Sequence, residues 1–196
     1  MEIQDQLEQF AQAVIDSPHN LVSRAARDEV RTRHVPESVA FARHLPAATK
    51  TLVDVGSGGG FPGVLIALVR PDIDVHLVES VGKKARFLAE VVGSLGVNAT
   101  VHHMRVEEFT RLTERVTPDA VSARAVASLR DLAALTAPLL PPGGFLYAIK
   151  GAQWKDELED ARATLERVKL RVYAEPDHGY EPETGALPRI VVLQKA

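Results

Sequence analysis

The sequence predicts an α/β fold with a mostly parallel seven-stranded sheet, helices on both of its faces and an antiparallel C-terminal strand. Short apolar segments alternate along the chain with longer segments of helical periodicity, as in strand–helix–strand units. A dense glycine turn, residues 56–60, joins the first apolar segment to a helical one. The last two apolar segments, 170–173 and 190–193, have no helical segment between them, so one of them is expected to run antiparallel.

The individual elements follow from periodicity and from residues that begin or end helices. Apolar residues recur at helical spacing from Ile3 to Ile15, and Ser17-Pro18 ends that helix. Pro36 begins a second helix, which runs to Leu45. Further helices are expected over 64–69, 83–95 (ending at Gly96), 105–109, 128–139 and 153–168, and further strands over 52–55, 74–79, 100–103, 118–123 and 145–151.

Length and composition indicate one domain over residues 1–196, with an N-terminal helical cap (1–50) and an α/β core (51–196). No apolar run is long enough for a membrane span, and the acidic first residues do not resemble a signal peptide. Cysteine is absent, which excludes disulfides, thiolate metal sites and a cysteine nucleophile, and fits a cytoplasmic location. The net charge is −3, so a nucleic-acid partner would require a local basic patch. The segment 20–45 is the basic candidate.

The glycine turn predicts a nucleotide-like ligand at the carboxyl end of the first strand. The dinucleotide pattern G-x-G-x-x-G/A fails because Phe61 occupies its last position. The pattern acid-x-Gly-x-Gly-x-Gly fits at Asp54, Gly56, Gly58 and Gly60, and it resembles the cofactor loop of S-adenosylmethionine (AdoMet) methyltransferases. AdoMet has no pyrophosphate but carries sulfonium and ammonium charges, so an acid at the strand end suits it. The alternative is a structural turn capped by Asp54.

Glu79 ends the second strand, 25 positions after Asp54. In nucleotide-binding α/β units an acid at this place accepts hydrogen bonds from ribose hydroxyls. The alternative is an ordinary acid at a helix N-terminus, where the helix dipole favours negative charge. Ser80 is expected to cap the helix that follows.

No metal site is expected. His102 and His103 are adjacent on a predicted strand, so their side chains point to opposite faces and cannot ligate one ion. The remaining histidines and acids show no ligand spacing.

The chain resembles the RsmG (GidB) family of bacterial ribosomal RNA small-subunit methyltransferases over nearly its whole length. Gly59, where many members have proline, and a shorter N-terminal helical region depart from the family pattern. The resemblance is carried, in family order, by Asn20-Leu21, Arg33-His34 with Glu37-Ser38, the loop DVGSGGGFPG, the stretch from Glu79 to Lys84 with Arg86-Phe87-Leu88, the stretch from Arg105 to Phe109, the stretch from Ser122 to Leu129, and the stretch from Tyr147 to Gly151.

The resemblance implies a Rossmann-like methyltransferase fold and transfer of a methyl group from AdoMet to N7 of a guanine in 16S rRNA of the small ribosomal subunit. By position it implies cofactor contacts at Gly56 and Phe61, adenine contacts at Val106 and Glu107, and a contact of Arg124 with the methionine part or the target base.

The residues after the predicted fourth strand fit methylation of a ring nitrogen. Guanine N7 has an in-plane lone pair and no proton, so no general base is needed, and orientation can supply most of the acceleration. The Asn/Asp-Pro-Pro-Tyr/Phe motif of amino-group methyltransferases is missing at Ala123-Arg124-Ala125-Val126. Arg124 could donate to guanine O6, and the alternative is a salt bridge, for example to Glu107. RNA-binding candidates, each with plain surface charge as its alternative, are Arg33, His34, Lys83, Arg105 and Lys150.

Two other function classes stay open at this point. One is a methyltransferase for a small molecule or a protein, against which the basic segment and the family blocks argue. The other is a module that binds AdoMet or a ribosomal particle without catalysis. A dehydrogenase is disfavoured by Phe61 in the glycine pattern.

Overall fold

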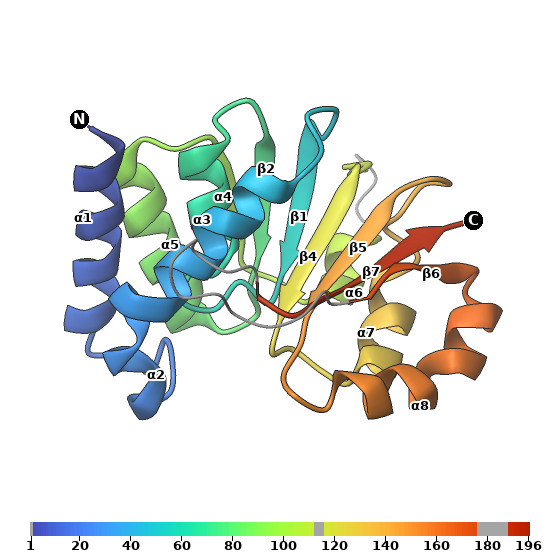
Figure 1. The fold of residues 1–196 in the computed structure, drawn as a ribbon. Helices are drawn as coiled ribbons and strands as arrows, with labels where there is room; N and C mark the ends of the chain where they lie inside the picture. The colour runs from blue at the N-terminus through green and yellow to red at the C-terminus, as the bar shows by residue number, and fades with distance from the viewer. Residues whose placement is uncertain (1, 112–115, 176–187) are drawn as a thin grey trace.

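A seven-stranded sheet in the order β3-β2-β1-β4-β5-β7-β6 forms the centre of the computed structural model, which describes residues 2–111, 116–175 and 188–196 (Figure 1). Strands β1 to β5 pair in parallel, and β7 runs antiparallel to both β5 and β6. The predicted fold class is confirmed. The strands are β1 (Thr51–Val55), β2 (Asp74–Val78), β3 (Ala99–His102), β4 (Ala120–Arg124), β5 (Phe145–Ile149), β6 (Leu170–Ala174) and β7 (Ile190–Lys195).

Helices cover both faces of the sheet (Figure 1). The N-terminal segment contains α1 (Ile3–Asp16), α2 (Arg24–Asp28), a π-helical turn η1 (Val30–His34) and α3 (Val35–His44). The basic segment is therefore helical well before Pro36, where a helix was expected to begin. The other helices are α4 (Gly63–Val69), α5 (Gly82–Leu95), α6 (Val106–Phe109), α7 (Leu129–Thr136) and α8 (Trp154–Arg167).

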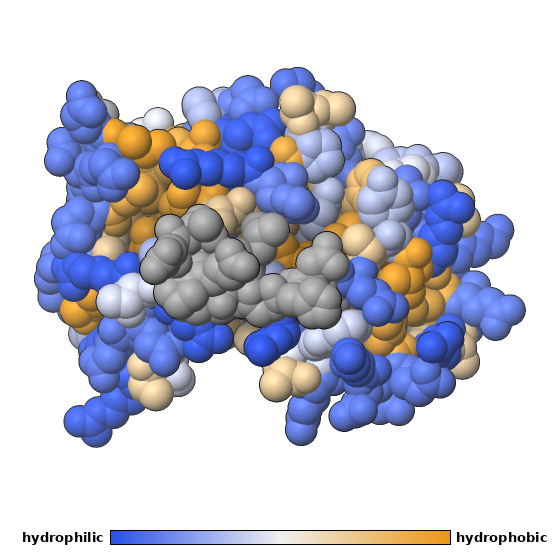
Figure 2. All heavy atoms as spheres, viewed as in Figure 1, coloured by the Kyte–Doolittle hydropathy of each residue, from blue (hydrophilic) through white to orange (hydrophobic). Residues whose placement is uncertain are grey.

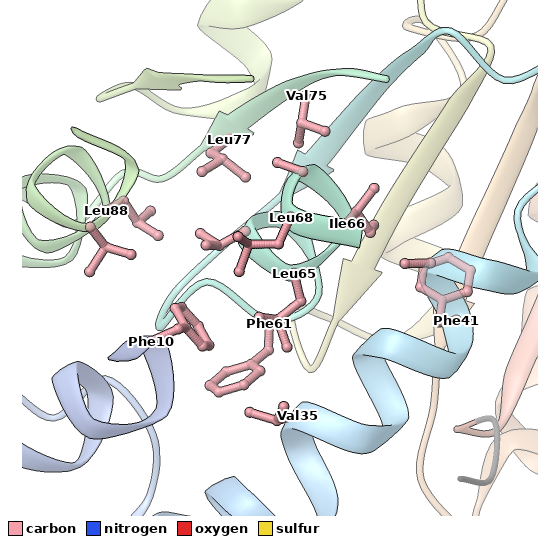
Figure 3. Packing of buried hydrophobic residues seen from close by; sticks show 14 of the residues in the cluster. Phe10, Val35, Phe41, Phe61, Leu65, Ile66, Leu68, Val75, Leu77 and Leu88 are labelled. Carbon is pink, nitrogen blue, oxygen red and sulfur yellow. The ribbon is translucent and has the colours of Figure 1, made fainter. Parts of the chain in front are cut away.

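Alternation along the strands divides the core into two apolar clusters, because successive strand residues face opposite sides of the sheet. Leu52 and Leu77 pack with α1, α3, α4 and α5, as Figure 3 shows around Phe10 and Leu65. Val53 on the next position of β1 packs instead with residues of α6, α7 and α8. A fully buried side chain of this size stabilises the fold by about 1.5–3 kcal/mol, so both layers are held by burial.

Local signals place the ends of two helices. Gly96 ends α5 in the left-handed conformation with φ 62°, as predicted. The Ser128 hydroxyl accepts a hydrogen bond from the Asp131 N–H at 3.1 Å and caps α7. None of the helices in the described ranges is long and apolar enough to cross a bilayer.

A hollow of about 710 Å³ separates α1 from α3 and corresponds to the apolar area beside these helices in Figure 2. Leu7, Val35 and Val39 line it, and the Arg31–Glu8 ion pair stands at its rim. None of the site residues predicted from the sequence lines this hollow.

Candidate active site

The glycine turn lies at the carboxyl end of β1 and is fastened to the neighbouring strand. The Gly56 N–H donates to the Val78 carbonyl at the end of β2, at 2.8 Å. Gly56, Gly58 and Gly60 have φ values of 66°, 56° and 93°, which side chains disfavour, so the spacing of glycines follows from the shape of the turn. The turn therefore presents main chain rather than side chains at this edge of the sheet.

Asp54 lies beneath this turn and is 1% exposed. Its Oδ1 accepts a hydrogen bond from the Ser122 hydroxyl of β4 at 2.6 Å, because β1 and β4 pair with Asp54 opposite Ser122. Its Oδ2 has no hydrogen-bond partner among the described residues and lies against Gly63. Burial raises the pKa of this carboxyl to about 6, and the hydrogen bond from Ser122 lowers it only in part. The carboxylate therefore lies inside the fold, beneath the turn.

Glu79 follows β2 and connects the glycine turn to α5. Its Oε2 accepts the Gly58 N–H at 2.9 Å and its Oε1 accepts the Val81 N–H at 2.7 Å. The prediction that Ser80 caps α5 is wrong: the N-cap is Val81, without a side-chain cap, and Glu79 takes the free N–H. Glu79 is 5% exposed and has no cationic partner within the described ranges.

The predicted adenine contacts lie one strand further along the same edge. Val106 and Glu107 open α6 directly after β3, the strand beside β2. Val106 is buried and Glu107 is exposed. Phe61 is 7% exposed, and its ring packs edge-on against Phe10, with centroids 5.1 Å apart (Figure 3). Only the main chain of Phe61 therefore remains for contact with a ligand.

A cavity of about 890 Å³ opens beside the glycine turn, between the N-terminal helices and the loops after β4 and β5. The turn and the cavity meet where Val126 lies against Gly56: a Cβ added at Gly56 would be 2.7 Å from a Val126 methyl group. The lining combines both signs of charge and consists of Glu29, Thr32, Arg33, Glu37, Arg124, Ala125, Val126, Ala127, Ser128, Ile149, Lys150, Gly151, Glu157, Pro188 and Arg189.

Arg124 stands at the wall of this cavity with its guanidinium held by the N-terminal helices. Its Nη2 donates to Glu37 Oε2 at 3.1 Å and to His34 Nδ1. The prediction of a salt bridge to a neighbouring acid is confirmed, but the suggested partner, Glu107, is wrong. Glu107 follows β3, which is separated from β4 by two strands, β2 and β1, whereas α3 brings Glu37 directly to the end of β4.

The remaining basic candidates differ widely in how free their charges are. The Lys150 side chain is 6% exposed, and its ammonium donates to the Ala127 carbonyl and to Glu157. Arg33 is half exposed and pairs with Glu29 and Glu37. Lys83 and Arg105 are exposed. The structure therefore brings Arg33, Arg124 and Lys150 together at one cavity and places Lys83 and Arg105 on neighbouring helix starts.

Several functional candidates have only faint signals in the sequence. Glu37 is the main one. It stands in one of the family blocks, and its spacing of four residues from Arg33 on a helix is the clue to an ion pair. Ala125, which adopts φ 53° next to Arg124, has no signal in the sequence, since alanine rarely takes this conformation.

His76 pairs with His102 across β2 and β3, with ring nitrogens 2.9 Å apart. In the described residues no group of three His, Cys, Asp or Glu side chains is arranged to hold a metal ion.

Comparison with known proteins places this geometry in a family. The chain is 46% identical over 143 residues to a ribosomal RNA small subunit methyltransferase G of Rhodospirillum centenum, covering 73% of this chain and 64% of that protein. It is 45% identical over 134 residues to the protein of the same name from Beutenbergia cavernae, covering 68% of this chain and 61% of that protein. These matches thus span less than two thirds of the length of either relative.

Solved structures share the fold at low sequence identity. The O-methyltransferase TomG from Streptomyces achromogenes, in complex with AdoMet, superposes with a TM-score of 0.61 at 15% identity, over 97% of this chain and 89% of that one.

The family model described as GidB, rRNA small subunit methyltransferase G, matches residues 3–179. The chain belongs to the GidB family of rRNA small-subunit methyltransferases G.

Proposed function

We propose that this protein is an AdoMet-dependent methyltransferase that methylates N7 of a guanine in 16S rRNA. Family membership supports the reaction class and the small-subunit substrate. The observation that carries the proposal is one edge of the sheet, where Arg124 lines a cavity of mixed charge and Val126 of the same lining lies against Gly56 of the glycine turn. Glu79 holds that turn through the Gly58 N–H. We further propose that residues 1–196 act as one domain, with the cap over 1–50, in the cytoplasm where ribosomal subunits are found.

The residues present fit AdoMet as the bound cofactor. The Glu79 carboxylate is buried with no cationic partner among the residues that the structure describes, and its two oxygens have lone pairs left after the bonds from Gly58 and Val81. A buried acid of this kind suits ribose hydroxyls, which are donors. The loop over Gly56, Gly58 and Gly60 offers main-chain groups at close range. Val106 and Glu107 are proposed to flank the adenine, and Asp54 to support the turn from below.

The proposed chemistry asks little of the protein beyond orientation. AdoMet, when bound, supplies an electrophilic methyl group on sulfur. Arg124 would hold the target base or the cofactor in line, because a guanidinium donates to acceptors such as guanine O6. The segment from Arg124 to Ala127 exposes no amide side chain of the kind that would hold an exocyclic amino group. Holding the two reactants in one geometry is by itself worth several kcal/mol of the barrier.

RNA would approach from the basic side chains around this edge. Arg33, Lys83 and Arg105 have exposed charges that can meet phosphates. His34 is buried, the Lys150 side chain is 6% exposed, and both are already hydrogen-bonded, so we propose supporting roles for them in place of phosphate contact.

Radiolabelled AdoMet tests the proposal with small ribosomal subunits from a strain lacking this gene, followed by nucleoside analysis. Label in 7-methylguanosine at one site is expected. Label in another nucleoside would support rRNA methyltransferase activity but reject N7 of guanine as the target atom. AdoMet binding without label in RNA would favour a small-molecule or protein substrate, or a binding module without catalysis.

A further inference from the structure

The N-terminal cap supplies the two hydrogen-bond partners that the Arg124 guanidinium has in the described part of the chain. Glu37 on α3 and His34 at the end of η1 lie 87 and 90 positions away in the sequence. The Arg124 and Glu37 side chains are 16% and 7% exposed, so this ion pair is largely shielded from water. An ion pair in such surroundings is screened far less than one on the surface.

Glu37 is itself fixed at both of its carboxylate oxygens. While Oε2 accepts from Arg124, Oε1 accepts from Arg33 Nε at 3.0 Å. Arg33 in turn donates from Nη1 to Glu29 Oε2 at 2.9 Å. The carboxylate of Glu37 therefore cannot rotate without breaking one of its two charge-assisted hydrogen bonds.

His34 provides the second acceptor for the guanidinium. Because a guanidinium has no lone pair to offer, His34 Nδ1 must accept, and its proton therefore sits on Nε2. Burial and the adjacent Arg124 lower the pKa of His34 to about 4, so the ring is neutral at neutral pH. The π-helical hydrogen bond from the His34 N–H to the Glu29 carbonyl, at 3.0 Å, holds the main chain at His34, and π turns are frequent at functional sites.

A purely stabilising role explains this arrangement poorly. Replacing a buried ion pair with apolar side chains is often neutral or stabilising, so burying one is a weak way to gain stability. Arg124 Nη1 is also buried and has no hydrogen-bond partner among the described residues, which costs free energy. Arg124 lines the cavity and precedes Ala125, whose φ of 53° is strained for alanine.

We propose that Glu37 is a positioning residue for Arg124, fixing its guanidinium at the wall of the cavity where the reactants bind. His34 assists as the second acceptor. The N-terminal cap thereby completes the active site as well as covering the sheet. This inference rests on the proposed function, in which Arg124 orients the cofactor or the base.

A double-mutant cycle tests whether Glu37 acts through Arg124. The rate of a single turnover of methyl transfer to small subunits is measured for the wild type, Glu37→Gln, Arg124→Ala and the double variant. Glu37→Gln is expected to slow transfer at least tenfold while KM for subunits changes less than about twofold. In the Arg124→Ala background the same change is expected to cost less than twofold.

Two further variants separate positioning from loss of structure. Glu37→Asp keeps the charge on a shorter side chain and is expected to transfer faster than Glu37→Gln. Glu8→Gln breaks the exposed pair with Arg31 on the outer side of the cap and is expected to keep the wild-type rate. If circular dichroism shows that Glu37→Gln does not fold, Glu37→Asp replaces it in the cycle, in the wild type and in Arg124→Ala.

Three results would overturn the inference. The first is a wild-type rate in Glu37→Gln. The second is that Glu37→Gln slows transfer equally with Arg124 present and with Arg124 replaced. The third is a wild-type rate in Arg124→Ala, since Glu37 would then have nothing to position. Absence of methyl transfer by the wild type would instead overturn the proposed function. The same four proteins would then be compared by their calorimetric dissociation constants for AdoMet. Identical constants would reject positioning. A weaker affinity in Glu37→Gln that is not seen when the same change is made in the Arg124→Ala background would support it.

Discussion

The two halves of the candidate site are built by different interactions. The half at β1 and β2 consists of the glycine turn and Glu79. The Gly58 N–H donates to the Glu79 carboxylate, and the Gly56 N–H donates to the Val78 carbonyl of the adjacent parallel strand. The half at β4 consists of Arg124, whose partners are charged or polar side chains from helices almost ninety positions earlier. The first half depends on backbone shape and the second on matched charge, so different substitutions should damage them.

The largest effect is expected in the charged half, from Arg124→Ala. Methyl transfer should fall by about 1,000-fold, or about 4 kcal/mol in the barrier, because an oriented donor at the reacting groups is lost. The protein should stay folded, since Glu37 keeps its bond with Arg33. The rate of a single turnover measures methyl transfer, and a thermal melt measures whether the protein is folded. Arg130→Ala, which removes an exposed arginine of α7, is the matched control, and near wild-type turnover of Arg124→Ala would contradict the proposed role.

Gly63→Ala should break the backbone half. A Cβ at Gly63 would lie 2.6 Å from Asp54 Oδ2 and would also collide with Leu77, and both neighbours are tightly packed. We expect a loss of about 3 kcal/mol in the free energy of unfolding, measured with urea. Gly93→Ala in α5 is the control: an added Cβ there meets nothing within 4 Å, and alanine favours the helix by about 1 kcal/mol. Equal stability of the two variants would show that the approach at Gly63 is not close.

The two halves should also respond in opposite directions to pH. Burial raises the Asp54 pKa from 3.8 to about 6, so the folded state binds that proton more tightly, and stability falls as pH rises from about 4 to 6. Burial lowers the His34 pKa from 6.5 to about 4, so the stability it contributes is present above pH 6.5 and is lost as pH falls toward 4.

Urea unfolding between pH 4 and 6.5 measures these slopes. Asp54→Asn removes the contribution that falls with pH, so the free energy of unfolding should rise more steeply with pH than in the wild type. The difference between the two proteins should reach at most about 3 kcal/mol over the range, because each unit of pKa shift is worth about 1.4 kcal/mol. His34→Gln should make it rise less steeply. Curves for both variants that run parallel to the wild-type curve would contradict the assigned protonation states.

The smallest effect is expected from Glu79→Ala, which tests the ligand side of the backbone half. The dissociation constant for AdoMet should rise about tenfold, because the loss of one hydrogen bond to a charged group costs about 1.5 kcal/mol or more. Calorimetry measures the constant, with Glu90→Ala on the exposed side of α5 as control. An unchanged constant would remove Glu79 from the ribose and leave it as the connector between the turn and α5.

The sequence by itself determined the sheet, the position of the glycine turn and the place of Glu79. These features depend on local patterns, since alternation, helical spacing and glycine conformations are properties of short segments. Family blocks added the reaction and the rRNA substrate to the AdoMet ligand that the glycine pattern had already indicated. Errors at this level are small and local, such as the cap of α5, where the Glu79 carboxylate reaches the Val81 N–H in place of Ser80.

Only the tertiary structure decided which groups surround each site side chain. Strand register placed Ser122 opposite Asp54 and buried that carboxylate, and packing of α1 turned the Phe61 ring inward. Packing of α3 against the end of β4 chose Glu37, in place of Glu107, as the partner of Arg124. The physical reason is that a charge or ring is satisfied by whatever the fold brings within a few ångströms, and separation along the chain does not measure that distance.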